Sequence, residues 1–456
     1  MKLYDKKQIS QKPLLFDNRA LFLLLVPIVV EQLLNSFMGM VDTMMVSTVG
    51  SEAISAVSLV DSFNNLVIQV FSAMAAGAAI ICSQYLCSGN AQETNKAARQ
   101  VVLTVTVIST VVMLVCLLGG ERLLRLIFGE VEEEVMKDCL VYFLITVVSY
   151  PFLALFSVGT ALFRAGGNSS FPMKVSIYAN LLNIAGNVVL IYGFKWSVGG
   201  AALATLISRV FSMIVVFAAL RKPRQVIVIR DYLRFRPDMP LIWKIMAIGI
   251  PSGIENGMFQ FGKLAIQSTV STMGTAAIAA QAMASILEGL NGICGIGIGI
   301  GLMTVVGQCI GAGRYEEAKY YIVKLTKAAW VSIVISCLVV FAITKPVTWL
   351  AGMEAASAKL CFEMVTAITI VKPFAWVGSF IISYGLRAAG DVQFSMIVST
   401  VTMWCCRVVL CIFLVKVYQF GPMAVWIGMF ADWTARSVIF TGRFLSGKWL
   451  PVGREV

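Results

Sequence analysis

PIVVEQLLNSFMGMVDTMMVSTVGSEAISAVS (residues 27–58) and PSGIENGMFQFGKLAIQSTVSTMGTAAIAAQA (residues 251–282) are two copies of one motif in a single chain. A shift of 224 residues aligns the landmarks of the two copies: Pro27 with Pro251, Glu31 with Glu255 and Gly50 with Gly274. Farther along, RAGGNSSF from Arg164 matches RAAGDVQF from Arg387 at a shift of 223 residues. The nearly constant offset indicates an internal duplication. Two related membrane halves, with a substrate path at their interface, are typical of secondary transporters.

Composition places the chain in a membrane. Hydrophobic residues make up 59% of its 456 residues and charged residues only 13%, whereas about one quarter of a soluble domain is charged. We expect the first apolar run to remain as a membrane helix, because it is too long for a signal-peptide core.

The apolar segments predict the fold. Twelve of them are long enough to cross roughly 30 Å of hydrocarbon: 20–46, 54–84, 98–119, 138–164, 170–194, 198–220, 242–272, 277–309, 323–350, 359–386, 393–417 and 421–446. We therefore predict an all-α polytopic membrane protein with twelve transmembrane helices in two pseudo-symmetric six-helix lobes. The lobes comprise residues 1–220 and 245–456, and a cytoplasmic linker at 221–244 joins them.

Basic residues predict the orientation of the segments. A cytoplasmic N-terminus places most loop cations in the cytoplasm: Lys2, Lys6, Lys7, Lys12, Arg19, Arg221, Lys222, Arg224, Arg230, Arg234, Arg236, Arg314, Lys319, Lys324 and Lys327. The opposite loops hold fewer cations and an acidic run of Glu130, Glu132, Glu133 and Glu134. The positive-inside rule then puts both termini in the cytoplasm of a multi-pass cell-membrane protein. The net charge of +12 is accordingly a topology signal, and no nucleic-acid partner is expected.

Several classes of site are excluded by composition. The chain has no histidine, and its eleven cysteines are scattered singly, so no zinc site of Cys and His is expected. No G-x-x-x-x-G-K-[ST] motif for ATP hydrolysis occurs. The glycine run at residues 292–307 has no acidic residue after it, so we interpret it as small-xxx-small helix packing and not as a nucleotide loop. We expect no catalytic residue, no cofactor and no enzymatic activity.

Asp42 is the most informative charge inside an apolar segment. It lies one to two turns inside the outer end of the first segment, where an ionisable group normally faces a cavity or a partner. Because an apolar setting favours the neutral form of a carboxyl group, Asp42 can exchange a proton or take up a sodium ion. The alternative is a structural carboxylate that hydrogen-bonds neighbouring helices.

Three asparagines in the fifth segment are candidate partners of Asp42. Asn183 and Asn187 are four residues apart and share a helix face, and Asn180 lies one turn earlier. Their amide oxygens could complete an ion shell or hydrogen-bond Asp42, and a sodium ion could lie at Asp42, Asn183 and Asn187. The alternative is that these amides only hold helices together.

Four other ionisable residues are candidates for a substrate cavity. They are Glu31, Asp61, Glu255 and Lys372. The alternative for Glu31 and Glu255 is a structural role at hinges created by the two prolines. Lys372 precedes Pro373 and could pair with Glu255 or with Asp432, although Asp432 is also four residues from Arg436 and favours an internal ion pair with it.

These motifs together resemble the multidrug and toxic compound extrusion (MATE) family over about residues 15–445. The residues that carry the resemblance are Pro27, Asp42, Thr43 and Gly50; Gln84 with Ser88–Asn90; Gln308 with Gly311–Gly313; Arg164–Asn168; and Arg387–Asp391. The resemblance implies a fold of two bundles that rock between outward-open and inward-open states. It also implies efflux of organic, often cationic compounds, driven by inward movement of H+ or Na+.

The resemblance also assigns roles to single residues. The coupling aspartate of the first lobe falls on Asp42, and the fifth-segment positions fall on Asn183 and Asn187. Asn187 replaces an aspartate of the family pattern, which weakens a sodium site and favours H+. The seventh-segment glutamate of some members falls near Phe259, and no acid occurs near Val377–Ser379, so the second-lobe cation site does not carry over.

We therefore predict a monomeric antiporter in membrane lipid that exports small organic compounds in exchange for H+ or Na+. The alternative within the superfamily is a flippase of lipid-linked saccharides. It is favoured by four cations of the second lobe: Lys263, Lys372, Arg407 and Arg436. A sugar carrier of the other large two-lobe superfamily, a membrane-embedded enzyme and a non-transporting receptor or channel scaffold are weaker alternatives.

Overall fold

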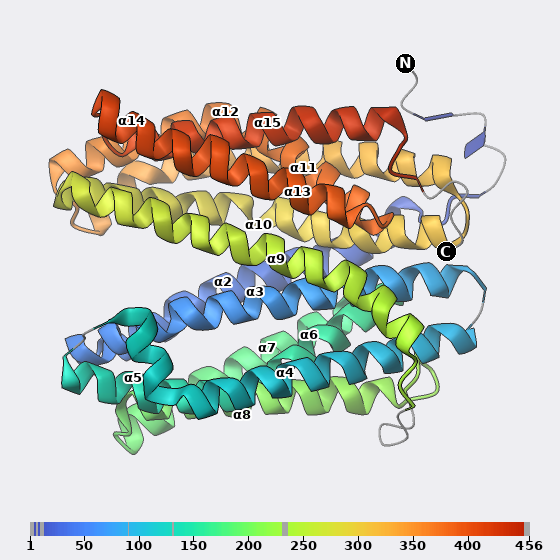
Figure 1. Cartoon of the computed structure of the whole chain (residues 1–456), viewed down its shortest axis with the longest axis horizontal. Coiled ribbons are helices and arrows are strands. Elements are labelled where there is room, and N and C mark those ends of the chain that lie inside the picture. The colour runs from blue at the N-terminus through green and yellow to red at the C-terminus, as the bar shows by residue number, and fades with distance from the viewer. Residues whose placement is uncertain are drawn as a thin grey trace. The chain divides into compact units, whose positions relative to one another are not determined.

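The chain folds into long helices. A computed structural model describes residues 4–5, 8–9, 13–89, 91–129, 132–229 and 236–450, and all regular secondary structure in these ranges is helical (Figure 1). Some residues used above to predict orientation and motifs lie outside the described ranges: Lys2, Lys6, Lys7, Lys12, Asn90, Glu130, Arg230 and Arg234.

The first half of the chain forms six apolar segments. Its helices are α2 (Asn18–Ser47), α3 (Ser51–Cys87), α4 (Ala91–Phe128), α5 (Glu133–Val148), α6 (Tyr150–Ala165), α7 (Ser170–Asn187), the π-helix η1 (Val188–Gly193) and α8 (Ser197–Leu220). α5 and α6 are bent by 43° at their junction, where Pro151 lies in the first turn of α6, and together they form one predicted segment. α7 continues into η1 and forms the next segment.

The second half repeats this order. Its helices are α9 (Met239–Val270), the 3₁₀-helix η2 (Ser271–Met273), α10 (Thr275–Gly311), α11 (Tyr315–Leu350), α12 (Ala355–Ala388), α13 (Val392–Thr402), the π-helix η3 (Met403–Val409), α14 (Leu410–Tyr418) and α15 (Met423–Ser446). α13, η3 and α14 follow one another as one predicted segment. Each of the twelve predicted segments therefore corresponds to a helix or to a joined set of helices.

Most of these helices are suited to a membrane. Within the described ranges, nine helices are long and apolar enough to span one, and the bent pair of α5 and α6 makes a tenth. α9 and α15 complete the predicted twelve, and both carry ionisable residues along their length. The prediction of an all-α polytopic membrane protein is confirmed.

Contacts between residues divide the chain into two compact units. Val30–Gly253 form the first unit, and the described residues up to Val29 form the second unit together with those from Ile254 onward. Both boundaries fall within three residues after an intrahelical proline, Pro27 in α2 and Pro251 in α9. Proline removes a hydrogen bond within a helix. α2 and α9 therefore pass from one unit to the other next to the point where their backbone is least constrained.

Close contacts at glycines show which helices α2 and α9 pack against. In the second unit, a Cβ on Gly301 of α10 would overlap Leu25 of α2. In the first unit, a Cβ on Gly77 of α3 would lie 3.3 Å from Ile248 of α9. The predicted lobe limits, 1–220 and 245–456, differ from the packing units in these leading turns and stay a prediction about domains.

The glycine run at residues 292–307 lies within the continuous helix α10. Added Cβ atoms at Gly295 and Gly299 would overlap the rings of Trp376 and Tyr384 on α12. The glycines therefore let the two helices approach closely, and the interpretation as a helix-packing motif is confirmed.

Candidate functional site

The predicted coupling residues of the first unit form one hydrogen-bond network. Asn187 Nδ2 donates to Asp42 Oδ1 at 2.8 Å, which joins α7 to α2. The same amide donates to Asn183 Oδ1 at 3.2 Å, and Asn183 Nδ2 donates to Thr205 Oγ1 of α8 at 3.2 Å. Asn183 and Asn187 are buried, and Asp42 is half-buried. The structure thus brings Asp42, Asn183 and Asn187 together.

The third asparagine does not share this network. Asn180 lies one turn before Asn183 on α7, and its Nδ2 atom is buried without a hydrogen-bond partner in the described part of the chain. Its predicted coupling role stays a prediction.

Asn187 lies where the helix changes type. α7 ends at this residue and the chain continues as the π-helix η1, and π-turns inside helices are frequent at functional sites. Asn187 Oδ1 is buried and has no hydrogen-bond partner among the described residues. A buried carbonyl oxygen without a partner is costly unless a proton donor or a cation satisfies it.

A second carboxylate, Asp61 of α3, belongs to the same charged cluster. Its Oδ1 accepts hydrogen bonds from Tyr142 Oη and Asn64 Nδ2, each at 3.1 Å. Asp42 and Asp61 interact electrostatically with each other and with Arg209 of α8. When both carboxylates are ionised, one guanidinium leaves one negative charge unbalanced, and uptake of one cation would neutralise the cluster.

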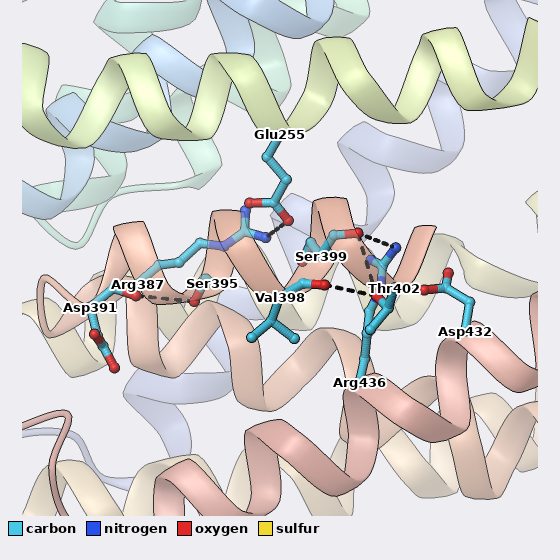
Figure 2. Close-up of polar contacts among 9 residues, drawn as sticks. All are labelled: Glu255, Arg387, Asp391, Ser395, Val398, Ser399, Thr402, Asp432 and Arg436. Carbon is cyan, nitrogen blue, oxygen red and sulfur yellow. Dashed lines mark hydrogen bonds and ion pairs between the residues drawn. The ribbon is translucent and has the colours of Figure 1, made fainter. Parts of the chain in front are cut away.

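The two glutamates aligned by the repeat both form ion pairs within their own units. Arg164 Nη2 lies 2.7 Å from Glu31 Oε2, and Ser176 Oγ donates to Glu31 Oε1 at 3.4 Å. Arg387 of α12 pairs in the same way with Glu255 of α9 (Figure 2). The sequence predicted these glutamates in a substrate cavity, and the structure places each of them opposite an arginine.

Lys372 has a different partner from the two that the sequence suggested. Neither Glu255 nor Asp432 pairs with it, so that prediction is wrong. Instead, its ammonium lies 2.6 Å from Glu288 Oε1 of α10 and over the ring of Trp376 at 5.4 Å. The reason is that α10 and α12 pack side by side through glycines, which puts Glu288 within reach of the fully buried lysine.

The internal ion pair predicted in α15 is confirmed. Arg436 Nε lies 2.7 Å from Asp432 Oδ1. Figure 2 shows the same guanidinium reaching α13, where it donates to Thr402 Oγ1 and to the carbonyl oxygen of Ser399.

Sequence reasoning missed several residues of these networks. Arg164 and Arg387 follow the two aligned glutamates at nearly the same distance along the chain, 133 and 132 residues, and that similarity was the signal for two equivalent ion pairs. Tyr142 and Thr205 gave no such signal. A threonine in an apolar helix usually bonds to its own backbone, and the sequence spacing of Tyr142 identifies no partner.

Comparisons with known proteins agree with the architecture. The MatE family model matches residues 27–189 and again residues 251–413, which are the two copies of the repeat. The chain is 27% identical to the uncharacterized transporter YisQ of Bacillus subtilis (strain 168), over 95% of each protein. It is 26% identical to the probable multidrug resistance protein NorM of Thermotoga maritima, over 95% of this chain and 93% of that protein.

The fold is also that of a solved structure. A crystal structure of MATE in complex with MaL6 superposes with a TM-score of 0.87 at 17% identity, and covers 94% of this chain and 96% of that one. The predicted fold of two lobes with six helices each is confirmed.

Proposed function

Because the chain belongs to the MatE family of transporters, we propose that it is a secondary active antiporter that exports small organic compounds in exchange for H+ or Na+. The chain is a multi-pass membrane transporter of the compound-export type and not an enzyme. The comparisons do not favour a lipid-linked saccharide flippase. The coupling ion, the antiport mechanism and the substrate are the proposed part.

The observation that carries the proposal is the network around Asp42. It combines a half-buried carboxylate, a buried amide oxygen without a partner and one unbalanced negative charge inside membrane helices. A site of this kind is expensive to bury unless a cation occupies it in part of the working cycle. Cation uptake at Asp42 therefore has a physical reason.

Coupling follows from linkage between two ligands. If the cation and the organic compound favour different states of the two lobes, or compete for one state, binding of one promotes release of the other. We propose that the lobes rock between outward-open and inward-open states. The cation would load at Asp42 on the outer side as the compound leaves.

The geometry favours a proton as the cation. Asn187 turns its Nδ2 donor, and not its oxygen, toward Asp42. A sodium ion needs several oxygen ligands, so sodium binding would require the Asn187 amide to rotate. The second carboxylate oxygen of Asp42 can accept a proton without any change in the hydrogen-bond network.

The remaining features follow from the same proposal. We propose that the protein works as a monomer in the lipid of the cell membrane, with both termini in the cytoplasm. The substrate would be a small organic compound. NorM of Thermotoga maritima is named a probable multidrug resistance protein, which supports a compound of foreign origin as the first class to test.

The test uses purified full-length protein in proteoliposomes. Transport of a fluorescent organic cation is recorded under a pH gradient and then under a Na+ gradient, for the wild type and for Asp42→Asn. Asp138→Asn is the matched control, since Asp138 is a half-buried carboxylate of the same unit with no bond to the Asp42 network.

The proposal predicts that one gradient drives transport by the wild type and the control but not by Asp42→Asn. If Asp42→Asn transports as well as the wild type, Asp42 is structural, and Glu31, Asp61 and Glu255 become the candidates. If no protein moves the dye under either gradient, the proposed substrate class is wrong.

A further inference from the structure

Two cations share one aromatic ring in the second unit. Phe259 and Lys263 lie one helical turn apart on α9, and Lys263 Nζ lies 4.9 Å from the centre of the Phe259 ring. The guanidinium of Arg407, from η3, lies 5.1 Å from the same ring. Gly262 permits this approach of α9 to η3, because a Cβ there would overlap Met403.

Neither cation has a carboxylate of its own. Within the described residues, no ion pair joins Lys263 or Arg407 to an acidic side chain. Arg407 is only 4% exposed, yet its Nε and Nη1 atoms are buried without a hydrogen-bond partner among those residues. A buried guanidinium in this state is costly unless a ligand accepts its hydrogen bonds.

The nearby acids are already paired. Glu288 interacts electrostatically with both cations but forms its ion pair with Lys372. Asp432 interacts with Arg407 but forms its ion pair with Arg436. The four cations and two carboxylates therefore leave two positive charges unbalanced, which is the opposite of the negative cluster in the first unit.

The repeat allows the charges of the two units to be compared position by position. The shift of 224 residues places Ile266 where the first unit has Asp42, so the second unit lacks the equivalent acid. Arg407 instead lies in the middle of a π-helix, and π-turns are frequent at functional sites. Lys263 is exposed on α9, so a ligand can reach it.

We propose that Lys263, Arg407 and Phe259 form a binding site for the carboxylate or phosphate group of an organic anion. The planar fork of Arg407 matches such groups, with Nε and Nη1 as the free donors, and Lys263 supplies a second charge beside the same ring. As a subsite for transported compounds, the site rests on the proposed export function. It extends the expected substrates from organic cations to compounds with an acidic group.

Binding of soluble probes tests the site without any ion gradient. Calorimetry measures the affinity of phenyl phosphate and of benzoate for full-length protein in a neutral detergent. Lys263→Gln is the main variant, because this side chain is exposed and its loss should not disturb folding. Lys345→Gln is the matched control, since Lys345 is an exposed lysine of the same unit that lies 4.8 Å over the ring of Phe362.

We expect Lys263→Gln to weaken binding of at least one probe about tenfold or more, as loss of a hydrogen bond to a charged group implies, and Lys345→Gln to leave it unchanged. Arg407→Gln should weaken it further, and Arg407→Lys less. This measurement needs no transport and no ion gradient, so failed coupling and a failed anion site give different results.

Two results overturn the proposal: no Lys263-dependent binding of either probe, or equal weakening by Lys345→Gln. Where Lys263-dependent binding is found, adding phosphatidylglycerol identifies the source of the acidic group. If this anionic lipid displaces the probe, the site holds a lipid phosphate. If it does not, the site holds a soluble organic anion.

Discussion

Replacing Glu255 with Gln removes the negative charge of a buried ion pair and keeps the size of the side chain. In the pair, 17% of the Arg387 side chain and 9% of the Glu255 side chain are exposed. Removal of one partner from a buried ion pair costs about 3–5 kcal/mol, because the other charge stays buried and uncompensated. The glutamine oxygen can still accept a hydrogen bond from Arg387, so we expect the lower end of this range, about 3 kcal/mol.

The assay is reversible unfolding of detergent-solubilised protein in SDS or urea, followed by intrinsic fluorescence. Glu121→Gln is the control. Its partner is Arg125, and the side chains of Glu121 and Arg125 are 50% and 41% exposed, so the loss should be much smaller than for the buried pair. A double-mutant cycle with Arg387→Gln isolates the pair, and the double variant should lose less stability than the sum of the two single variants.

A loss for Glu255→Gln no larger than that for Glu121→Gln would refute this reasoning. It would mean that Arg387 finds another partner and that Glu255 is free, as a residue that binds substrate would be.

Two further predictions concern the first unit and the helix packing. Asn187→Asp adds a carboxylate next to Asp42, and the added charge attracts a cation strongly at this distance. Transport of the fluorescent organic cation under a Na+ gradient should therefore rise about tenfold or more over the wild type. An unchanged response to Na+ in the proteoliposome assay would contradict the assigned site. Gly299→Ala places a Cβ on the ring of Tyr384, so the free energy of unfolding should fall by about 1–3 kcal/mol. Gly289→Ala, which meets no neighbouring atom within 4 Å, should cause no loss, and equal losses for the two variants would contradict the close packing of α10.

The first-unit network was the part of the site most open to prediction from sequence. Asn183 and Asn187 are four residues apart, and helical spacing alone puts them on one face. That this face meets Asp42 required a guess about which helices are neighbours, and the structure supports the guess through a hydrogen bond of 2.8 Å.

The ion pairs of the second unit were less open to prediction. The partner of Lys372 depends on the packing of α10 against α12, which is set by the shapes of glycines and aromatic rings and not by a periodic pattern. The π-helices η1 and η3 have no sequence signature, so the placement of Arg407 beside Phe259 could not be foreseen. By contrast, the twelve segments follow directly from the length of each apolar run.

Ion release on substrate binding shows directly whether Asp42 carries the coupling ion. Purified protein is mixed with a transported compound in a weakly buffered solution, and a pH electrode and a Na+ electrode record the released ion. We expect release of about one ion per bound compound from the wild type, and none from Asp42→Asn, since the two ligands compete through linkage. If both proteins release the same amount, Asp42 does not carry the coupling ion.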